Sequence, residues 1–221
     1  MKARPRLPRL RCFPPLPYLP TRHPQATTMT HPTAADPAAG TPAAPPRPDR
    51  VAPLREVLDQ LSRLVQQLDP PRYNTKPVTT YGGSVGGHVR HCLDHVSALL
   101  CGTRGEPIDY EARQRGSDIE TCPHAALEQL GRLDAALADL DPHANPPVTA
   151  VLMLSPHAPL LRTESTLDRE LAFVLNHTIH HHAMIAGMAK ALDVPVPDGF
   201  GMAPGTLQHQ QNQNAAAPTP A

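Results

Sequence analysis

Four stretches of the chain repeat apolar residues at the spacing of an α-helix, and this pattern restricts the fold most. The clearest stripe runs from Leu54 to Leu68, with an apolar residue at every third or fourth position. Similar stripes predict helices over about 84–100, 123–140 and 166–192, the last with Ser165 as its N-cap. Each helix must bury its stripe against another element, so the sequence predicts an all-α four-helix bundle.

The composition agrees with a helical core. Aromatic residues make up 3% of the chain and Trp is absent, which favours packed aliphatic helices over a β-sandwich. Residues 148–154 are apolar and β-prone, and with 160–163 they predict a short β-hairpin between the third and fourth helices. The sequence has no run of about 20 apolar residues, so no membrane span is expected.

Two segments outside the bundle have a different composition. Residues 1–50 contain 13 prolines and are predicted to be disordered. Met29 offers an alternative start, in which case residues 1–28 would not be translated. The bundle is predicted over 51–204, and 205–221 is predicted to be a disordered tail. Residues 51–221 carry 12 basic and 18 acidic side chains, which gives no footprint for nucleic acid.

Histidines gather on two of the predicted helices, which together hold 7 of the 13 in the chain. His177 and His181 are four residues apart, so on a helix both imidazoles can reach one metal ion. On the second predicted helix His88, His91 and His95 share a face, and any of them could be the third ligand. Three histidines would leave coordination positions open, as in a catalytic site.

Packing alone is the alternative explanation of these histidines. A single His-x-x-x-His pair is weak support for a metal site, but two clusters on facing helices are stronger. Burying imidazoles without partners would cost about 1–3 kcal/mol for each unsatisfied group. Asp94, Asp109 and Glu170 are candidate carboxylate partners for the rings. Cys92 falls on another face and is predicted to be a small core residue.

The two histidine strings, residues 88–95 and 170–185, resemble the DinB/YfiT-like superfamily. The resemblance implies an up-down-down-up four-helix bundle that binds a divalent metal through three histidines. His177 and His181 match the family's His-x-x-x-His, and His91 with Asp94 matches its His-x-x-Asp. The implied ligands are therefore His91, His177 and His181, with His88 or His95 as the alternatives to His91.

The same resemblance suggests an activity, because the family includes transferases that use low-molecular-weight thiols such as bacillithiol or mycothiol. The expectation is a metal-dependent thiol S-transferase that carries Zn, Ni or Fe and acts on a small molecule. Arg90, Arg113 or Arg115 would bind an anionic cosubstrate. The alternative is a non-catalytic metal-binding or stress-response bundle. A hydrolase ranks last, because no general base stands in a motif. We expect a cytoplasmic homodimer with no nucleic-acid or membrane partner.

Overall fold

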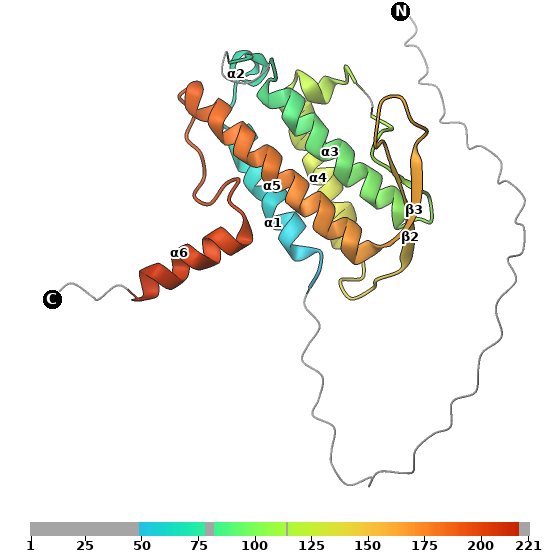
Figure 1. Cartoon of the computed structure of the whole chain (residues 1–221). Helices are drawn as coiled ribbons and strands as arrows, with labels where there is room; N and C mark the ends of the chain where they lie inside the picture. Colours follow the sequence, from blue (N-terminus) through green and yellow to red (C-terminus); the bar gives the residue numbers. More distant parts are fainter. Residues whose placement is uncertain (1–48, 78–81, 114, 217–221) are drawn as a thin grey trace, which may run out of the picture. The chain divides into compact units, whose positions relative to one another are not determined.

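The helices of the computed structural model form a four-helix bundle (Figure 1), and the structure describes residues 49–77, 82–113 and 115–216. The bundle helices are α1 (Ala52–Val65), α3 (Val85–Gly102), α4 (Pro123–Ala138) and α5 (Leu167–Ala191). Both α1 and α3 pack against α4 and α5, so α1 and α3 are diagonal to each other. The predicted all-α bundle is confirmed, and the pair α3·α5 brings the two histidine-rich helices together.

The predicted hairpin is also present, and it belongs to a three-stranded sheet. Strand β2 (Pro147–Leu152) pairs antiparallel with β3 (Leu161–Thr166). A strand that the sequence did not predict, β1 (Ile108–Asp109), pairs parallel with β2. Strand β3 ends at Thr166 and α5 begins at the next residue, so the sheet is joined directly to the helix that carries His177.

The start of α5 differs from the prediction by one residue. Thr166 is the N-cap, and its side chain accepts a hydrogen bond from the backbone N–H of Arg169 at 3.3 Å. Ser165, which the sequence suggested as the cap, instead donates its hydroxyl to Glu170 at 2.5 Å. Ser165 is the penultimate residue of β3, and because helical backbone begins only at Leu167, the residue directly before the helix, Thr166, is the cap.

Three shorter helices complete the described part. They are α2 (Pro70–Asn74), the 3-10 helix η1 (Asp118–Glu120) and α6 (Pro204–Ala216). Helix α6 falls where the sequence suggested a tail without regular structure. Its side chains are almost all exposed, and its Gln and Ala residues favour a helix without an apolar stripe. Residues 1–48 and 217–221, which the sequence assigned to disordered ends, lie outside the described residues.

The apolar stripes meet inside the bundle. On α1, the leucines Leu54, Leu58, Leu61 and Leu64 are each at most 2% exposed. Cys92 on α3 is fully buried, and burial raises the pKa of its thiol to about 12. The thiol therefore stays protonated at neutral pH, in agreement with the core role predicted for it.

Gly86 permits the close approach of α3 to the chain beside it. A Cβ at this position would lie 2.1 Å from the carbonyl oxygen of Glu120 and 2.5 Å from the ring of Tyr73. We therefore expect Gly86→Ala to reduce the free energy of unfolding by about 3 kcal/mol, because the backbone must move. Urea unfolding of the metal-free protein would measure the change.

The neighbouring glycine supplies the control. A Cβ on Gly87 would meet Ser84 Oγ at 3.5 Å, an ordinary contact. Gly87→Ala should therefore leave stability within about 1 kcal/mol of the wild type, on the stabilising side. Equal losses in the two variants would contradict the steric explanation.

Candidate metal centre

Five histidines converge where α3 and α5 face each other. His88, His91 and His95 lie on successive turns of α3, and His177 and His181 lie one turn apart on α5. Helical spacing places each set on one face of its helix, and the packing of α3 against α5 places the two sets opposite each other. The three sequence-predicted ligands, His91, His177 and His181, are all in this cluster.

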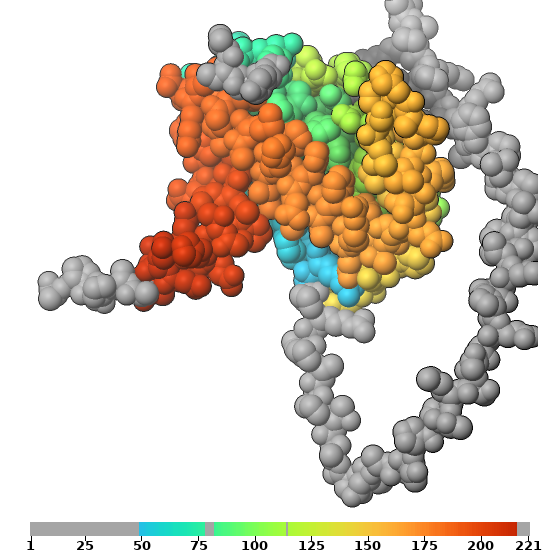
Figure 2. Space-filling view, in the orientation of Figure 1, coloured from blue at the N-terminus to red at the C-terminus, as the bar shows by residue number. Residues whose placement is uncertain are grey.

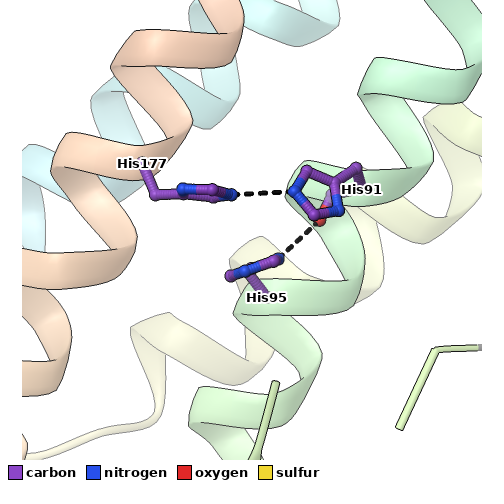
Figure 3. A group of neighbouring side chains, drawn as sticks. All are labelled: His91, His95 and His177. Carbon is purple, nitrogen blue, oxygen red and sulfur yellow. Dashed lines mark hydrogen bonds between the residues drawn. The ribbon is translucent and has the colours of Figure 1, made fainter. Parts of the chain in front are cut away.

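Three of the five imidazoles offer donor nitrogens that lie close enough to share one ion. One ring nitrogen from each of His91, His95 and His177 lies within 4.8 Å of the other two (Figure 3). The Nε2 atoms of His91 and His177 are 2.8 Å apart, and the rings of His95 and His177 stack with centroids 4.2 Å apart. Nitrogens bound to one tetrahedral zinc ion lie about 3.4 Å apart, given bonds of about 2.05 Å. Small ring movements would thus convert the cluster into a ligand set.

The tautomer of His95 follows from its hydrogen bond. Its Nδ1 lies 3.0 Å from the backbone carbonyl of His91, and a carbonyl can only accept, so Nδ1 carries the proton and donates it. The Nε2 of His95 then has a free lone pair. Between His91 and His177 one nitrogen must carry a proton for the other to accept, and a bound cation would take the place of that proton.

His181 is positioned differently from His95. Its Nδ1 pairs with the Nδ1 of His88 at 2.8 Å, while its ring lies 4.5 Å from that of His91 and 4.6 Å from that of His177, centroid to centroid. His181 therefore borders the group of three and links it to His88. Sequence reasoning had named His95 as an alternative ligand but gave no reason to place it beside His177.

The pKa values of the clustered histidines keep their rings neutral, as binding of a metal cation requires. Burial, together with neighbouring imidazoles, lowers the pKa of His91 to about 2, of His177 to about 4 and of His181 to about 3. The pKa of His95 is lowered as well, mainly by burial. All four rings are therefore uncharged at neutral pH, which is the form that coordinates metals.

The carboxylates that the sequence suggested as partners of the rings bond elsewhere. Asp94 is paired with Arg90 at 2.6 Å, and Asp109 accepts backbone N–H groups in its own turn. Glu170 is fully buried and accepts three hydrogen bonds from side chains near the start of α5 and from the loop after β1. In the described part of the chain, imidazoles and a backbone carbonyl take the places expected for these carboxylates.

The three arginines considered as binding residues for an anionic cosubstrate have different environments in the structure. Arg90 is 12% exposed and is held by Asp94 and Glu120. Arg115 is exposed. Arg113 is half-buried, and its charge contributes to the lowered pKa values of His91 and His177. Among the three, Arg113 is thus the arginine whose charge lowers the pKa of histidines in the cluster.

The family comparison agrees with this geometry. A model of the DinB superfamily matches residues 53–185, which include α1 from its second residue and the whole histidine cluster. The chain belongs to the DinB superfamily. The resemblance that the histidine strings indicated is therefore confirmed, and a group of histidines that could hold a metal ion lies within the matched residues.

Similarity to individual known proteins covers only part of the chain. The chain is 30% identical over 111 residues to "FK506-binding protein 5" of the fungus Rhizopus delemar, a match that covers 48% of this chain and 28% of that protein. No solved structure matches the chain significantly. Among the described residues, none of the helices is both long enough and apolar enough to traverse a bilayer.

Proposed function

We propose that this DinB-superfamily protein is a metal-dependent transferase that uses a low-molecular-weight thiol. The observation that carries the proposal is the group of three neutral imidazoles, His91, His95 and His177, contributed by two facing helices. Three protein ligands leave at least one coordination position for a thiol or water, whereas a structural site is usually closed by four.

The donor set indicates the class of metal. Imidazole nitrogens suit Zn²⁺, Ni²⁺ and Fe²⁺ better than Mg²⁺ or Ca²⁺, which prefer oxygen. When bound, such an ion would lower the pKa of a thiol at the open position and so supply a thiolate at neutral pH. His91 and His177 belong to both the sequence-derived and the geometric ligand sets. We propose His95 as the third ligand, because its donor nitrogen lies within 4.8 Å of those of His91 and His177, and because its Nε2 keeps a lone pair while its Nδ1 donates to a carbonyl.

The chain's own residues would bind and orient the thiol. Arg113 is anchored through its Nε to the carbonyl of Tyr110 and through Nη2 to the carboxylate of Glu111, both at 3.2 Å. Its Nη1 then remains to bind an anionic group of the cosubstrate. In the transfer itself, the thiol sulfur forms a bond to an electrophilic carbon, the leaving group departs with its electron pair, and the thiol proton passes to water.

The test combines metal content with turnover. Purified protein loaded with Zn²⁺, Ni²⁺ or Fe²⁺ would be incubated with a panel of small thiols and 1-chloro-2,4-dinitrobenzene, from which the reaction releases chloride. A rate above the uncatalysed reaction, lost on chelation, is the expected result. A protein that binds one metal per chain and turns over none of the thiols would instead favour the non-catalytic metal-binding bundle.

The proposal also covers assembly and location. We propose a homodimer in the cytoplasm that takes small-molecule substrates. Exposed large apolar side chains on the β2–β3 hairpin, Met153, Leu154 and Leu160, support a contact between two copies. Size-exclusion chromatography with light scattering should give twice the chain mass of 23.8 kDa. The mass of a single chain would exclude the dimer.

A further inference from the structure

Tyr110 lies against the metal centre although the cluster of donor nitrogens does not include it. Tyr110 is 4% exposed, and its ring stacks on the His95 imidazole, with centroids 5.2 Å apart and planes inclined by 21°. The His95 ring is also nearly parallel to His177, at 25°. With its Nδ1 fixed on the carbonyl of His91, the His95 imidazole is thus held by stacked rings and by one hydrogen bond.

The Tyr110 hydroxyl is tied to a buried carboxylate. It donates to Glu170 Oε2 at 2.7 Å, and Glu170 is completely shielded from solvent. The other carboxylate oxygen accepts from Ser165 at 2.5 Å and from Arg169 at 2.8 Å. Burying a carboxylate is costly unless it is hydrogen-bonded, and these three donors bond both of its oxygens. Burial and the bond to Glu170 both raise the pKa of Tyr110, so the phenol remains a donor.

The small sheet fixes both ends of this network. Ile108 and Asp109 pair with Ala150 and Val151 of β2, which sets the backbone immediately before Tyr110. Ser165 lies on β3, which pairs with the other edge of β2. One donor to Glu170, Ser165, therefore lies in the sheet and another, Tyr110, directly follows it, while Glu170 lies on α5 two helical turns before His177. This arrangement connects the position of Tyr110 to that of the metal-binding helices.

We infer that Tyr110, anchored by Glu170, is a positioning residue that sets the orientation of the His95 ring for metal binding. The inference rests on the proposed function, in that His95 serves as a ligand. It does not require Tyr110 to touch metal or substrate. Groups that orient a ligating histidine typically alter metal affinity by about 10–100-fold when they are removed.

The test uses Co²⁺ alone as the probe, because its visible absorption depends on coordination geometry. Tyr110→Phe keeps the stacked ring and removes the hydroxyl. We expect it to weaken Co²⁺ affinity by about 10–100-fold and to change the visible spectrum, with far-UV circular dichroism unchanged. Glu170→Gln keeps the shape of the anchor, removes its charge, and should shift affinity and spectrum in the same direction by less.

Tyr73→Phe is the matched control. Tyr73 is also fully buried, and its hydroxyl donates to the carbonyl of Ile119 at 2.8 Å, away from the histidine cluster. The Tyr73→Phe variant should lose about as much stability as Tyr110→Phe and keep the wild-type Co²⁺ affinity and spectrum. Wild-type affinity and spectrum in both Tyr110→Phe and Glu170→Gln, or equal weakening in Tyr73→Phe, would overturn the positioning role. A wild type that takes up no Co²⁺ would instead overturn the metal site itself.

Discussion

Replacing His177 with alanine is expected to reduce metal affinity by on the order of 100-fold or more, so that the purified variant retains almost no metal. The reason is that His177 contributes a donor nitrogen 2.8 Å from that of His91 and within 4.8 Å of that of His95. Removing a ligand should cost more than removing a group that only orients one, which already costs about 10–100-fold. Elemental analysis and chelator competition would measure the loss.

Three further variants make this experiment specific. His95→Ala should reduce metal affinity as much as His177→Ala does. His181→Ala should reduce it by about 10-fold or less, because His181 borders the group of three. His180→Ala is the control, since His180 is exposed on the same helix. If His181→Ala loses its metal while His95→Ala retains it, the result would support the sequence-derived set of His91, His177 and His181. Wild-type metal content in His177→Ala would contradict both sets.

Much of the bundle could be predicted because its helices are amphipathic over several turns. The apolar stripe of α1 is long enough that local pattern and tertiary burial agree, and the same holds for α3, α4 and α5. The hairpin was also predictable from its β-prone residues. Strand β1 was not, because two residues give no periodicity and Ile108 and Asp109 become a strand only by pairing with β2.

The candidate site was predictable in composition and less so in detail. Helical spacing places His177 and His181 on one face of α5, but a pattern cannot say which α3 histidine meets them. That depends on how far α3 and α5 are offset along their axes, which is set by packing between the helices. The resulting offset brings His95 against His177 and His88 against His181.

The Tyr110–Glu170 contact was beyond sequence reasoning for a similar reason. The two residues are 60 positions apart, and the contact exists because the sheet carries the loop after β1 to the start of α5. Tyr110 lies in a long polar segment, residues 103–120, and nothing in the pattern of that segment indicated which carboxylate would accept its hydroxyl.

Acid is expected to unfold the metal-free protein well before most of its carboxylates titrate. Burial lowers the pKa of His182 to about 3, and it is the first cause of the lowered values of His91, His177 and His181. In the unfolded chain these side chains titrate near 6.5, so unfolding takes up protons below that pH. Stability is therefore full above about pH 6.5 and falls as the pH drops toward 4, where His177 begins to protonate in the folded protein.

The free energy of unfolding is expected to fall steeply as the pH drops. Each such group contributes up to about 1.4 kcal/mol per pH unit, and with solvent screening halving the effect four groups give roughly 3 kcal/mol per unit. Domains are stable by about 5–15 kcal/mol, so the loss between pH 6.5 and 4.5 should be close to complete unfolding for a marginal fold. Urea unfolding in chelator at pH 7.5, 6 and 5 would measure it.

His182→Phe tests the cause of that slope away from the metal site. His182 is fully buried against Phe200, with ring centroids 4.3 Å apart, and neither of its ring nitrogens has a hydrogen-bond partner among the described residues. Phenylalanine should fill the same space without a polar group to leave unsatisfied, so the variant should be at least as stable at pH 7.5. It should also lose stability less steeply on acidification, by up to about 1.4 kcal/mol per pH unit, while metal content stays at the wild-type level. An unchanged slope would show that the acid sensitivity arises from other groups.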